Sequence, residues 1–212
     1  YPKYKPSNIE WIGDIPEHWN VIRVKPVIES ETNGFWGDEE KGDENDVLCI
    51  RVADFDSGFD NLSTQNNTFR NIQISDFERR ELNYGDLLIE KSGGGEISPV
   101  GRVGLYKLKS TRALTSNFMA RLRPNLGLVK SEFLFYYFKN MYSRRINVRS
   151  IKQTTGIQNL DTYSYFNEQI TLPPIPEQTA MATYLDNKTT QIDKLISGKQ
   201  KLIELLKEER TA

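Results

Sequence analysis

The sequence is poor in the residues that build metal centres and disulfides. Its 212 residues include one cysteine, Cys49, and one histidine, His18. Structural zinc sites draw their ligands mainly from these two residue types, and an internal disulfide needs two cysteines. We therefore expect no metal ion and no cofactor, and the scarcity of cysteine favours a reducing, cytoplasmic setting.

Long apolar runs are also missing. No stretch approaches the ~20 apolar residues that a membrane-spanning helix needs. The chain opens with Tyr1-Pro2-Lys3, without an initiator methionine or a signal-peptide pattern, so we expect the first residues of the gene product to precede Tyr1. With 37% hydrophobic and 11% aromatic residues, the composition predicts a soluble globular protein without a membrane partner.

Motifs for nucleotide hydrolysis and DNA cleavage are incomplete. The glycine-rich stretch at residues 92–96 lacks the last glycine of a dinucleotide-binding loop and the Lys-Ser/Thr pair of a P-loop. Asp86 and Glu90 precede Lys91, but the spacer that separates acid from lysine in metal-dependent nucleases is absent. The sequence therefore favours a protein without catalytic residues, and a stand-alone nuclease is the alternative.

The net charge of -1 hides a strong polarity along the chain. Residues 1–46 hold five Lys/Arg against eleven Asp/Glu, whereas residues 97–152 hold twelve against one. A surface with such an excess of positive charge favours a polyanionic partner, and nucleic acid is the usual one. The pattern indicates DNA binding, and the alternative is a solvated face balanced by the acidic first segment.

Strand and helix patterns alternate over residues 1–172 and predict a domain of the α+β class with a twisted β-sheet. A loop is expected at residues 29–46, which are acidic and contain glycine. A short helix is expected from Ser75, which forms a capping box with Glu78, and an amphipathic helix is expected from Ser131. Strands are expected at residues 20–24, 47–53, 68–74, 87–91, 103–108 and 117–122.

A proline-rich segment and a long helix are expected to end the chain. Three prolines at residues 173–176 predict a stiff linker. Residues 177–212 then predict one long helix with apolar side chains at heptad spacing, which favours a coiled coil with a partner helix. The alternative is a helix that folds back onto its own domain. The heptad positions are occupied by Met181, Leu185, Ile192, Leu195, Leu202 and Leu206.

Four segments, in this order and spacing, resemble the specificity subunits of type I restriction-modification enzymes. The resemblance covers nearly the whole chain, and its strongest part is the proline segment with the following helix. The matching segments are residues 11–19 (WIGDIPEHW), 85–89 (GDLLI), 153–160 (QTTGIQNL) and 172–178 (LPPIPEQ) with the helix after it.

The resemblance implies the fold, function and partners of the protein. Members of the family usually carry two target-recognition domains, each followed by such a helix, and the helices pair antiparallel and set the distance between two DNA half-sites. This chain holds one such unit, so we expect either a half-length subunit that forms a homodimer or a fragment of a longer subunit. The implied partners are double-stranded DNA, modification subunits that bind S-adenosylmethionine and methylate adenine, and ATP-dependent restriction subunits.

The expected activity is therefore sequence-specific recognition of one half of a bipartite DNA target, without catalysis in this chain. A scaffold protein whose helix matters more than its domain is the second alternative. Loop-borne polar residues suit DNA because glycine permits close approach, while Gln and Asn can pair with adenine edges. For each of them, the alternative is a tight turn with satisfied hydrogen bonds. The candidate DNA-binding residues are Arg51, Lys91, Ser92, Gly93, Gly94, Arg102, Arg121, Arg123, Lys152, Thr154, Thr155, Gln158 and Asn159.

Overall fold

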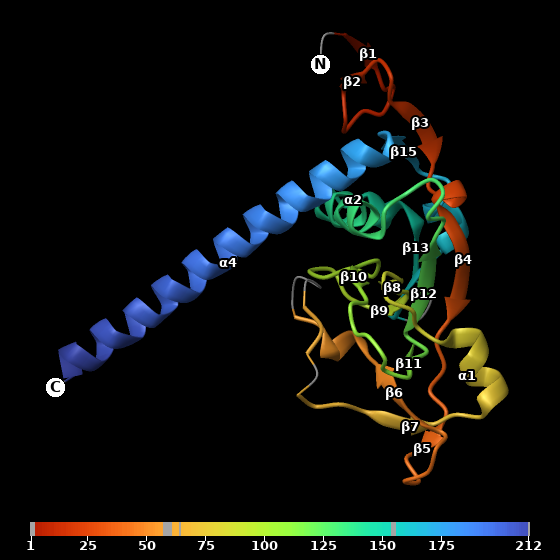
Figure 1. The fold of residues 1–212 in the computed structure, drawn as a ribbon, viewed down its shortest axis with the longest axis vertical. Helices are drawn as coiled ribbons and strands as arrows, with labels where there is room; N and C mark the ends of the chain where they lie inside the picture. Colours follow the sequence, from red (N-terminus) through yellow and green to blue (C-terminus); the bar gives the residue numbers. More distant parts are fainter. Residues whose placement is uncertain (1–2, 57–60, 64, 154–155, 212) are drawn as a thin grey trace.

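A long C-terminal helix, α4 (Ile175–Thr211), projects from a domain that mixes strands and helices (Figure 1). The structure is a computed structural model that describes residues 3–56, 61–63, 65–153 and 156–211. The α+β class and the long terminal helix that the sequence predicts are confirmed. Among the described helices, none is both long enough and apolar enough to cross a membrane.

An antiparallel sheet in the order β10-β8-β12-β4 lies at the centre of the domain. Its central strand β8 carries Leu87, Leu88 and Ile89, all fully buried, because helix α2 packs on one face and a second sheet on the other. Strand β4 occupies part of the predicted loop at residues 29–46, so that prediction is wrong there. The elements are β4 (Ile28–Asn33), β8 (Leu87–Glu90), β10 (Val103–Leu105), β12 (Met119–Pro124) and α2 (Ser131–Ser143).

The second sheet has the order β11-β6-β7-β5, and β11 runs parallel to β6. The sequence did not predict β11, and the predicted strand at residues 47–53 gives way after Ile50 to a 3₁₀ helix (Val52–Asp54). Helix α1 (Ile74–Arg80) begins one residue before Ser75 without the expected capping box. The strands are β5 (Asp38–Glu39), β6 (Asp46–Ile50), β7 (Phe69–Asn71) and β11 (Ala113–Thr115).

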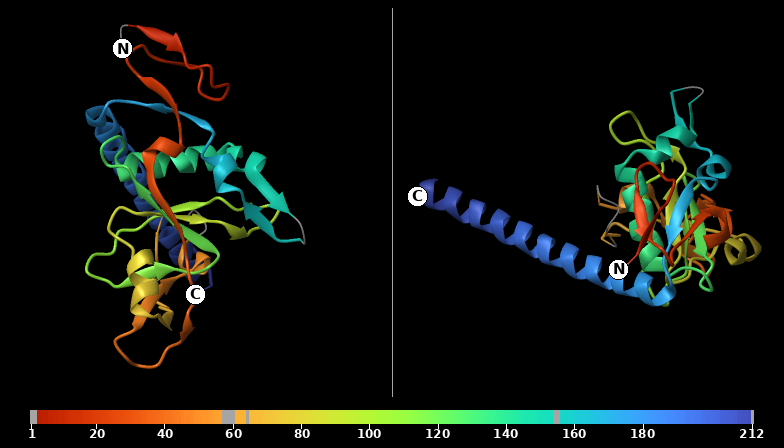
Figure 2. Two further views of the ribbon diagram at one scale, coloured as in Figure 1. Left: turned by 90° about the vertical axis from the view of Figure 1, so that its right-hand side faces the viewer. Right: turned by 90° about the horizontal axis from the view of Figure 1, so that it is seen from above.

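Smaller sheets complete the domain. A three-stranded sheet, β13-β14-β9, extends outward from the domain (Figure 2). It consists of β9 (Ser92–Gly93), β13 (Ile151–Gln153) and β14 (Gln158–Leu160). The other elements are β1 (Tyr4–Pro6), β2 (Asp14–Pro16), β3 (Asn20–Arg23), β15 (Gln169–Leu172), α3 (Thr162–Tyr165) and 3₁₀ helices at Lys25–Val27 and Ile146–Ser150.

Helix α4 begins earlier than the sequence predicts. Its first residue is Ile175, and Pro176 lies in the first turn, where the N–H that proline lacks would have no partner inside the helix. Gln178 and Ala182 are buried against the domain, whereas every described side chain from residue 191 to residue 210 is exposed. The start of the helix therefore belongs to the domain, and the rest projects from it.

Candidate nucleic-acid interface

Two segments that the sequence selected separately lie side by side. Strand β9 pairs antiparallel with β14, which places Ser92 opposite Asn159 and Gly93 opposite Gln158. The two strands belong to the sheet that extends from the domain (Figure 2). Thr154 and Thr155, which the sequence also selected, lie outside the described residues.

The polar side chains of these strands divide between the interior and the surface. Gln158 is buried, and its Oε1 accepts a hydrogen bond of 3.2 Å from the Val100 backbone N–H. Asn159, the next residue on β14, is exposed. Lys152 on β13 is exposed, and its Nζ lies 2.7 Å from Asp161 Oδ2. This hydrogen bond from Lys152 lowers the pKa of the Asp161 carboxyl.

A cleft of about 550 Å³ lies beside β9 and gathers five of the predicted residues. Arg102 forms two hydrogen bonds to the buried carboxylate of Glu90, at 2.8 and 2.9 Å. Arg51 Nε is 3.1 Å from Asp54 Oδ1. Each carboxylate raises the pKa of the guanidinium that it binds, so both arginines are charged and held in place. The predicted residues in the lining are Arg51, Ser92, Gly93, Gly94 and Arg102.

The same cleft is also lined by residues that the sequence did not select, and Trp36, Asn117 and Phe118 are the exposed ones with large or amide side chains. Trp36 lies in a segment predicted as a loop, and its ring faces the guanidinium of Arg70 at 4.6 Å. Asn117 and Phe118 form a turn ahead of β12, where the sequence predicted continuous strand. The Asn117-Phe118 pair was the available signal in the sequence, but the strand propensity of the residues that follow favoured a continuous strand.

Lys91, at the end of β8, is held by polar neighbours on β4. Its Nζ donates to Glu31 Oε1 at 2.9 Å and to Asn33 Oδ1 at 2.7 Å. Two of the other predicted cations lie on β12, in the middle of the covered central sheet. Charged groups at such positions have little contact with water, so these groups need hydrogen-bond or ion-pair partners inside the protein.

Arg121 and Arg123 find those partners within the domain. Arg121 is 6% exposed and donates to the Glu81 carbonyl at 2.8 Å and to Thr32 Oγ1 at 2.9 Å. Burial lowers the pKa of Arg121, whereas hydrogen bonding to Asp86 raises the pKa of Arg123. The sequence placed both arginines on a DNA-facing surface, but the structure directs both guanidiniums to internal partners.

Other cations of the basic segment remain exposed at the end of α2. Arg144, Arg145 and Arg149 follow this helix on the surface. Arg145 Nη1 lies 3.4 Å from the Glu96 carbonyl, and Tyr142 Oη donates to the Pro99 carbonyl at 3.0 Å. The end of α2 therefore contacts the loop that follows β9 and brings exposed positive charge next to it.

The family of type I restriction modification DNA specificity domains matches residues 16–205. The chain belongs to this family.

Curated specificity subunits are similar to this chain in sequence, and a solved structure shares its fold. The MjaVIII specificity subunit of Methanocaldococcus jannaschii is 26% identical over 194 residues, which are 90% of this chain and 43% of that protein. The EcoBI specificity subunit of Escherichia coli is 22% identical over 77% of this chain and 33% of its own length. The HsdS subunit from Thermoanaerobacter tengcongensis shares the fold, with a TM-score of 0.64, 18% identity, and coverage of 91% of this chain and 48% of that one. This chain therefore spans less than half of each of them.

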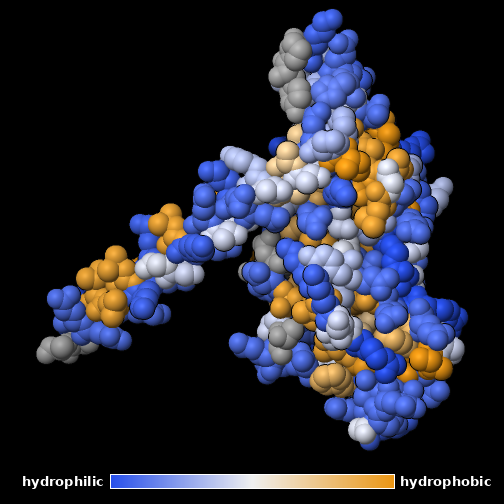
Figure 3. All heavy atoms as spheres, viewed as in Figure 1, coloured by the Kyte–Doolittle hydropathy of each residue, from blue (hydrophilic) through white to orange (hydrophobic). Residues whose placement is uncertain are grey.

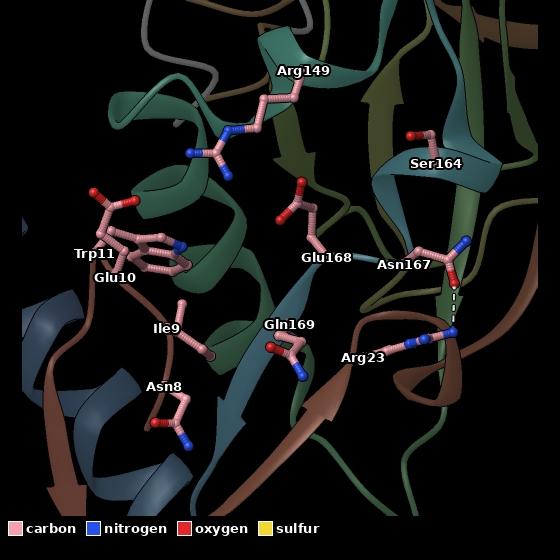
Figure 4. Close-up of a pocket in the computed structure, with 10 residues that line it drawn as sticks. All are labelled: Asn8, Ile9, Glu10, Trp11, Arg23, Arg149, Ser164, Asn167, Glu168 and Gln169. Carbon is pink, nitrogen blue, oxygen red and sulfur yellow. Dashed lines mark hydrogen bonds between the residues drawn. The ribbon is translucent and has the colours of Figure 1, made fainter. Parts of the chain in front are cut away.

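The specificity domain has a second cleft, of about 490 Å³, and no residue of β9 or β14 lines it. Figure 4 shows the residues that do. The cleft is lined by residues of the N-terminal segment, β3, α3, the start of β15 and the 3₁₀ helix at Ile146–Ser150, and its lining includes none of the predicted DNA-binding residues. Arg23 Nη1 donates to Asn167 Oδ1 at 3.2 Å, and the side chain of Arg149 points in from the opposite side (Figure 4). Both acids and arginines line the cleft, so it does not select for a ligand of one charge.

Buried polar contacts fix α4 to the specificity domain. The Gln178 side chain accepts from the Lys130 backbone N–H at 2.9 Å and donates to the carbonyls of Leu128 and Pro173 at 3.0 and 2.9 Å. Tyr136 Oη donates to Asp186 Oδ1 at 2.6 Å. These contacts reach two successive parts of the helix and therefore set its direction.

The segment that opens the family resemblance also contacts this helix. Glu177 Oε1 lies 2.6 Å from His18 Nε2, and Glu177 Oε2 accepts from Trp19 Nε1 at 2.9 Å. Trp11 packs edge-on against Tyr137, with ring centroids 5.9 Å apart. Trp11 and Trp19 therefore pack at the base of α4.

Proposed function

We propose that this chain is a non-catalytic recognition subunit that binds one half of a bipartite DNA target in a type I restriction-modification complex. The family match over residues 16–205 carries the proposal. The pairing of β9 with β14 supports it, because two separate polar segments meet beside one cleft. Modification subunits, restriction subunits and double-stranded DNA are the proposed partners, in the cytoplasm.

In this proposal, the cleft and the β9–β14 surface face the DNA. The backbone of Ser92, Gly93 and Gly94 lies against phosphates, and Asn159 points toward the bases. Three of the predicted cations already bind carboxylates within the domain, and in this proposal they hold the neighbouring backbone in place and do not contact DNA. They are Arg51, Lys91 and Arg102. Thr154 and Thr155 stay in the proposed interface on the strength of the sequence resemblance alone.

Methylome sequencing tests this function directly. A host without other adenine methyltransferases would express the chain with a modification subunit from the same source organism. We expect methylated adenines within one two-part motif, since a bipartite reader directs methylation to its own target. Methylation that is absent, or that follows no motif, would contradict the proposal, and a strain lacking this chain is the control.

The exposed cations at the end of α2 are the proposed phosphate contacts. Arg144→Glu with Arg145→Glu should weaken binding to target and random DNA alike and reduce the salt slope by about 2, since each lost phosphate contact removes ~1 from it. Arg121→Glu with Arg123→Glu is the contrasting pair, and we expect it to lower folding stability because both side chains bond internally. Fluorescence anisotropy across salt concentrations measures the slope. An unchanged slope in the first variant would remove these arginines from the interface.

We also propose that α4 pairs antiparallel with a second such helix, from another copy of the chain or from the other half of a longer subunit. Figure 3 shows apolar side chains gathered along the part of α4 that has left the domain. Leu195 is 60% exposed, and Ile192 and Leu202 are each more than half exposed. The heptad positions of this stripe also include two lysines, Lys188 and Lys199. In a parallel pair in register, each lysine would face the same lysine of the other helix, whereas an antiparallel pair places each opposite a different residue. A two-fold pair of this kind implies an inverted-repeat target with a fixed gap.

Light scattering tests this pairing. Leu195→Asp with Leu202→Asp should leave the domain folded but monomeric and unable to retain modification subunits, because two charges interrupt the apolar stripe. Thr190→Asp with Ser197→Asp has the same spacing on the opposite face of α4 and is the matched control. If the leucine variant still dimerises and assembles, α4 performs neither role.

A further inference from the structure

We propose that the turn at Asn117-Phe118 reads an adenine–thymine pair of the target, with the Asn117 amide on adenine and the Phe118 ring against the thymine methyl. The inference rests on the proposed DNA-recognition function and names residues that the sequence did not select. The turn lies between β11 and β12, at the edge of the cleft that also holds Ser92, Gly93 and Gly94.

The backbone of this turn is held rigidly beside the glycine-rich segment. The N–H groups of Lys91 and Ser92 both donate to the Phe118 carbonyl, at 2.9 and 3.1 Å. The Met119 N–H donates to the Ser116 carbonyl at 3.0 Å and closes the turn. Ser116 and Met119 are buried, so only the two residues at the tip reach solvent. A tip that is already ordered loses little conformational entropy when it meets a partner.

The side chains at the tip are free to bind. Phe118 is 48% exposed. Asn117 is exposed, and its side-chain amide has no hydrogen-bond partner within the part of the chain that the structure describes. A carboxamide offers one acceptor and one donor group side by side, which match adenine N6 and N7 in the major groove. An apolar ring suits the thymine methyl of the same or a neighbouring pair.

The surroundings of the turn favour DNA as the partner. Trp36, which is 38% exposed, adds a second aromatic surface to the cleft. Arg70 holds this tryptophan by its ring contact and by a 3.0 Å bond from Nε to the Trp36 carbonyl. Gly93 has a positive φ of 110°, and a Cβ atom there would meet no other atom within 4 Å, so this position is open to the close approach of a phosphate backbone. Gly94 has a φ of 61°, and a Cβ atom there would lie 2.7 Å from the Val100 backbone nitrogen, so this glycine lets the segment pack against the domain.

A double-mutant cycle between protein and DNA tests the assignment. The probe is the target duplex found by methylome sequencing, with each adenine replaced in turn by 7-deazaadenine and each thymine by uracil. The protein is the full chain assembled with its modification subunits. At one position, 7-deazaadenine should weaken wild-type binding about 5- to 150-fold, the range for a bidentate base contact. Asn117→Ala should show a similar loss on normal DNA and little further loss on the 7-deazaadenine duplex.

Uracil should reveal the Phe118 contact in the same way. Loss of one buried methyl group weakens binding about fourfold, and this loss should be absent in Phe118→Ala. Asn117→Asp is the second variant for Asn117, because aspartate suits the turn equally well but only accepts hydrogen bonds. It should lose the adenine preference and favour cytosine, whose N4 amino group donates. Asn20→Ala, an exposed asparagine on β3, is the control and should keep full selectivity.

The outcomes separate this inference from the proposed function. If the wild-type complex discriminates no sequence at all, the proposed function fails and the inference fails with it. If the wild type discriminates but Asn117→Ala and Asn117→Asp keep the same selectivity, the inference alone is overturned. If these variants lose modification subunits while target preference is retained, the turn is a protein-docking element and the inference is likewise overturned.

Discussion

Replacement of Gln178 should destabilise the junction between α4 and the domain more than any neighbouring change on the helix. Its side chain is fully buried and satisfies three backbone groups, the N–H of Lys130 and the carbonyls of Leu128 and Pro173. Gln178→Met keeps the volume of the side chain and removes all three hydrogen bonds. The effect therefore measures the polar contacts and not a cavity.

The structure sets the size of the expected loss. A buried backbone group that loses its partner costs about 1–3 kcal/mol, so three such groups give roughly 3–6 kcal/mol once water reaches some of them. This loss is large beside the ~5–15 kcal/mol that stabilises a typical domain. Because Gln178 joins the start of α4 to the segment that leads into α2, hydrogen exchange should also quicken at the first turns of both helices.

Urea unfolding followed by circular dichroism measures the change. Thr179→Ala is the matched control, since Thr179 is exposed and its hydroxyl bonds only to the Ile175 carbonyl of its own helix. We expect this control to lie within about 0.5 kcal/mol of the wild type. If Gln178→Met unfolds at the same urea concentration as Thr179→Ala, the three contacts do not hold the junction and the reasoning is refuted.

Further predictions concern β13, β14 and Asp161, the residue that follows β14. Gln158→Ala should lower stability, because it leaves the Val100 N–H without its acceptor, whereas Asn159→Ala should leave melting unchanged and lose target preference more than non-specific affinity in a binding assay. Equal losses on target and random DNA would reassign Asn159 to structure. Because the pKa of Asp161 is lowered in the folded protein, its carboxylate stabilises the fold at neutral pH, and this stabilisation is lost as the pH falls through the lowered pKa. The melting temperature of Asp161→Asn should therefore fall less steeply than that of the wild type below about pH 5. Lys152→Ala should reduce this fall too, and an unchanged acid profile in both variants would rule out this linkage.

Local patterns in the sequence were sufficient for the fold class and for α4. Heptad spacing and the absence of proline after Pro176 predict a long helix because helical periodicity depends on neighbours three and four residues away. The buried run Leu87–Ile89 predicts a central strand for the same local reason. The apolar stripe on α4 could also be predicted from the sequence. Because the stripe is exposed beyond residue 190, we propose that a partner helix packs against it.

Tertiary structure alone decided which residues share a surface. Gly93 on β9 and Gln158 on β14 are 65 positions apart in the sequence, yet they lie opposite each other in the sheet, and no local pattern specifies such a long-range partner. Charge counting could not separate Arg121, which lies on a covered strand, from Arg145, which lies on the surface, because burial depends on how sheets and helices stack. The turn at Asn117 was missed for a related reason, since the N–H groups that hold its Phe118 carbonyl belong to Lys91 and Ser92, which are distant in sequence.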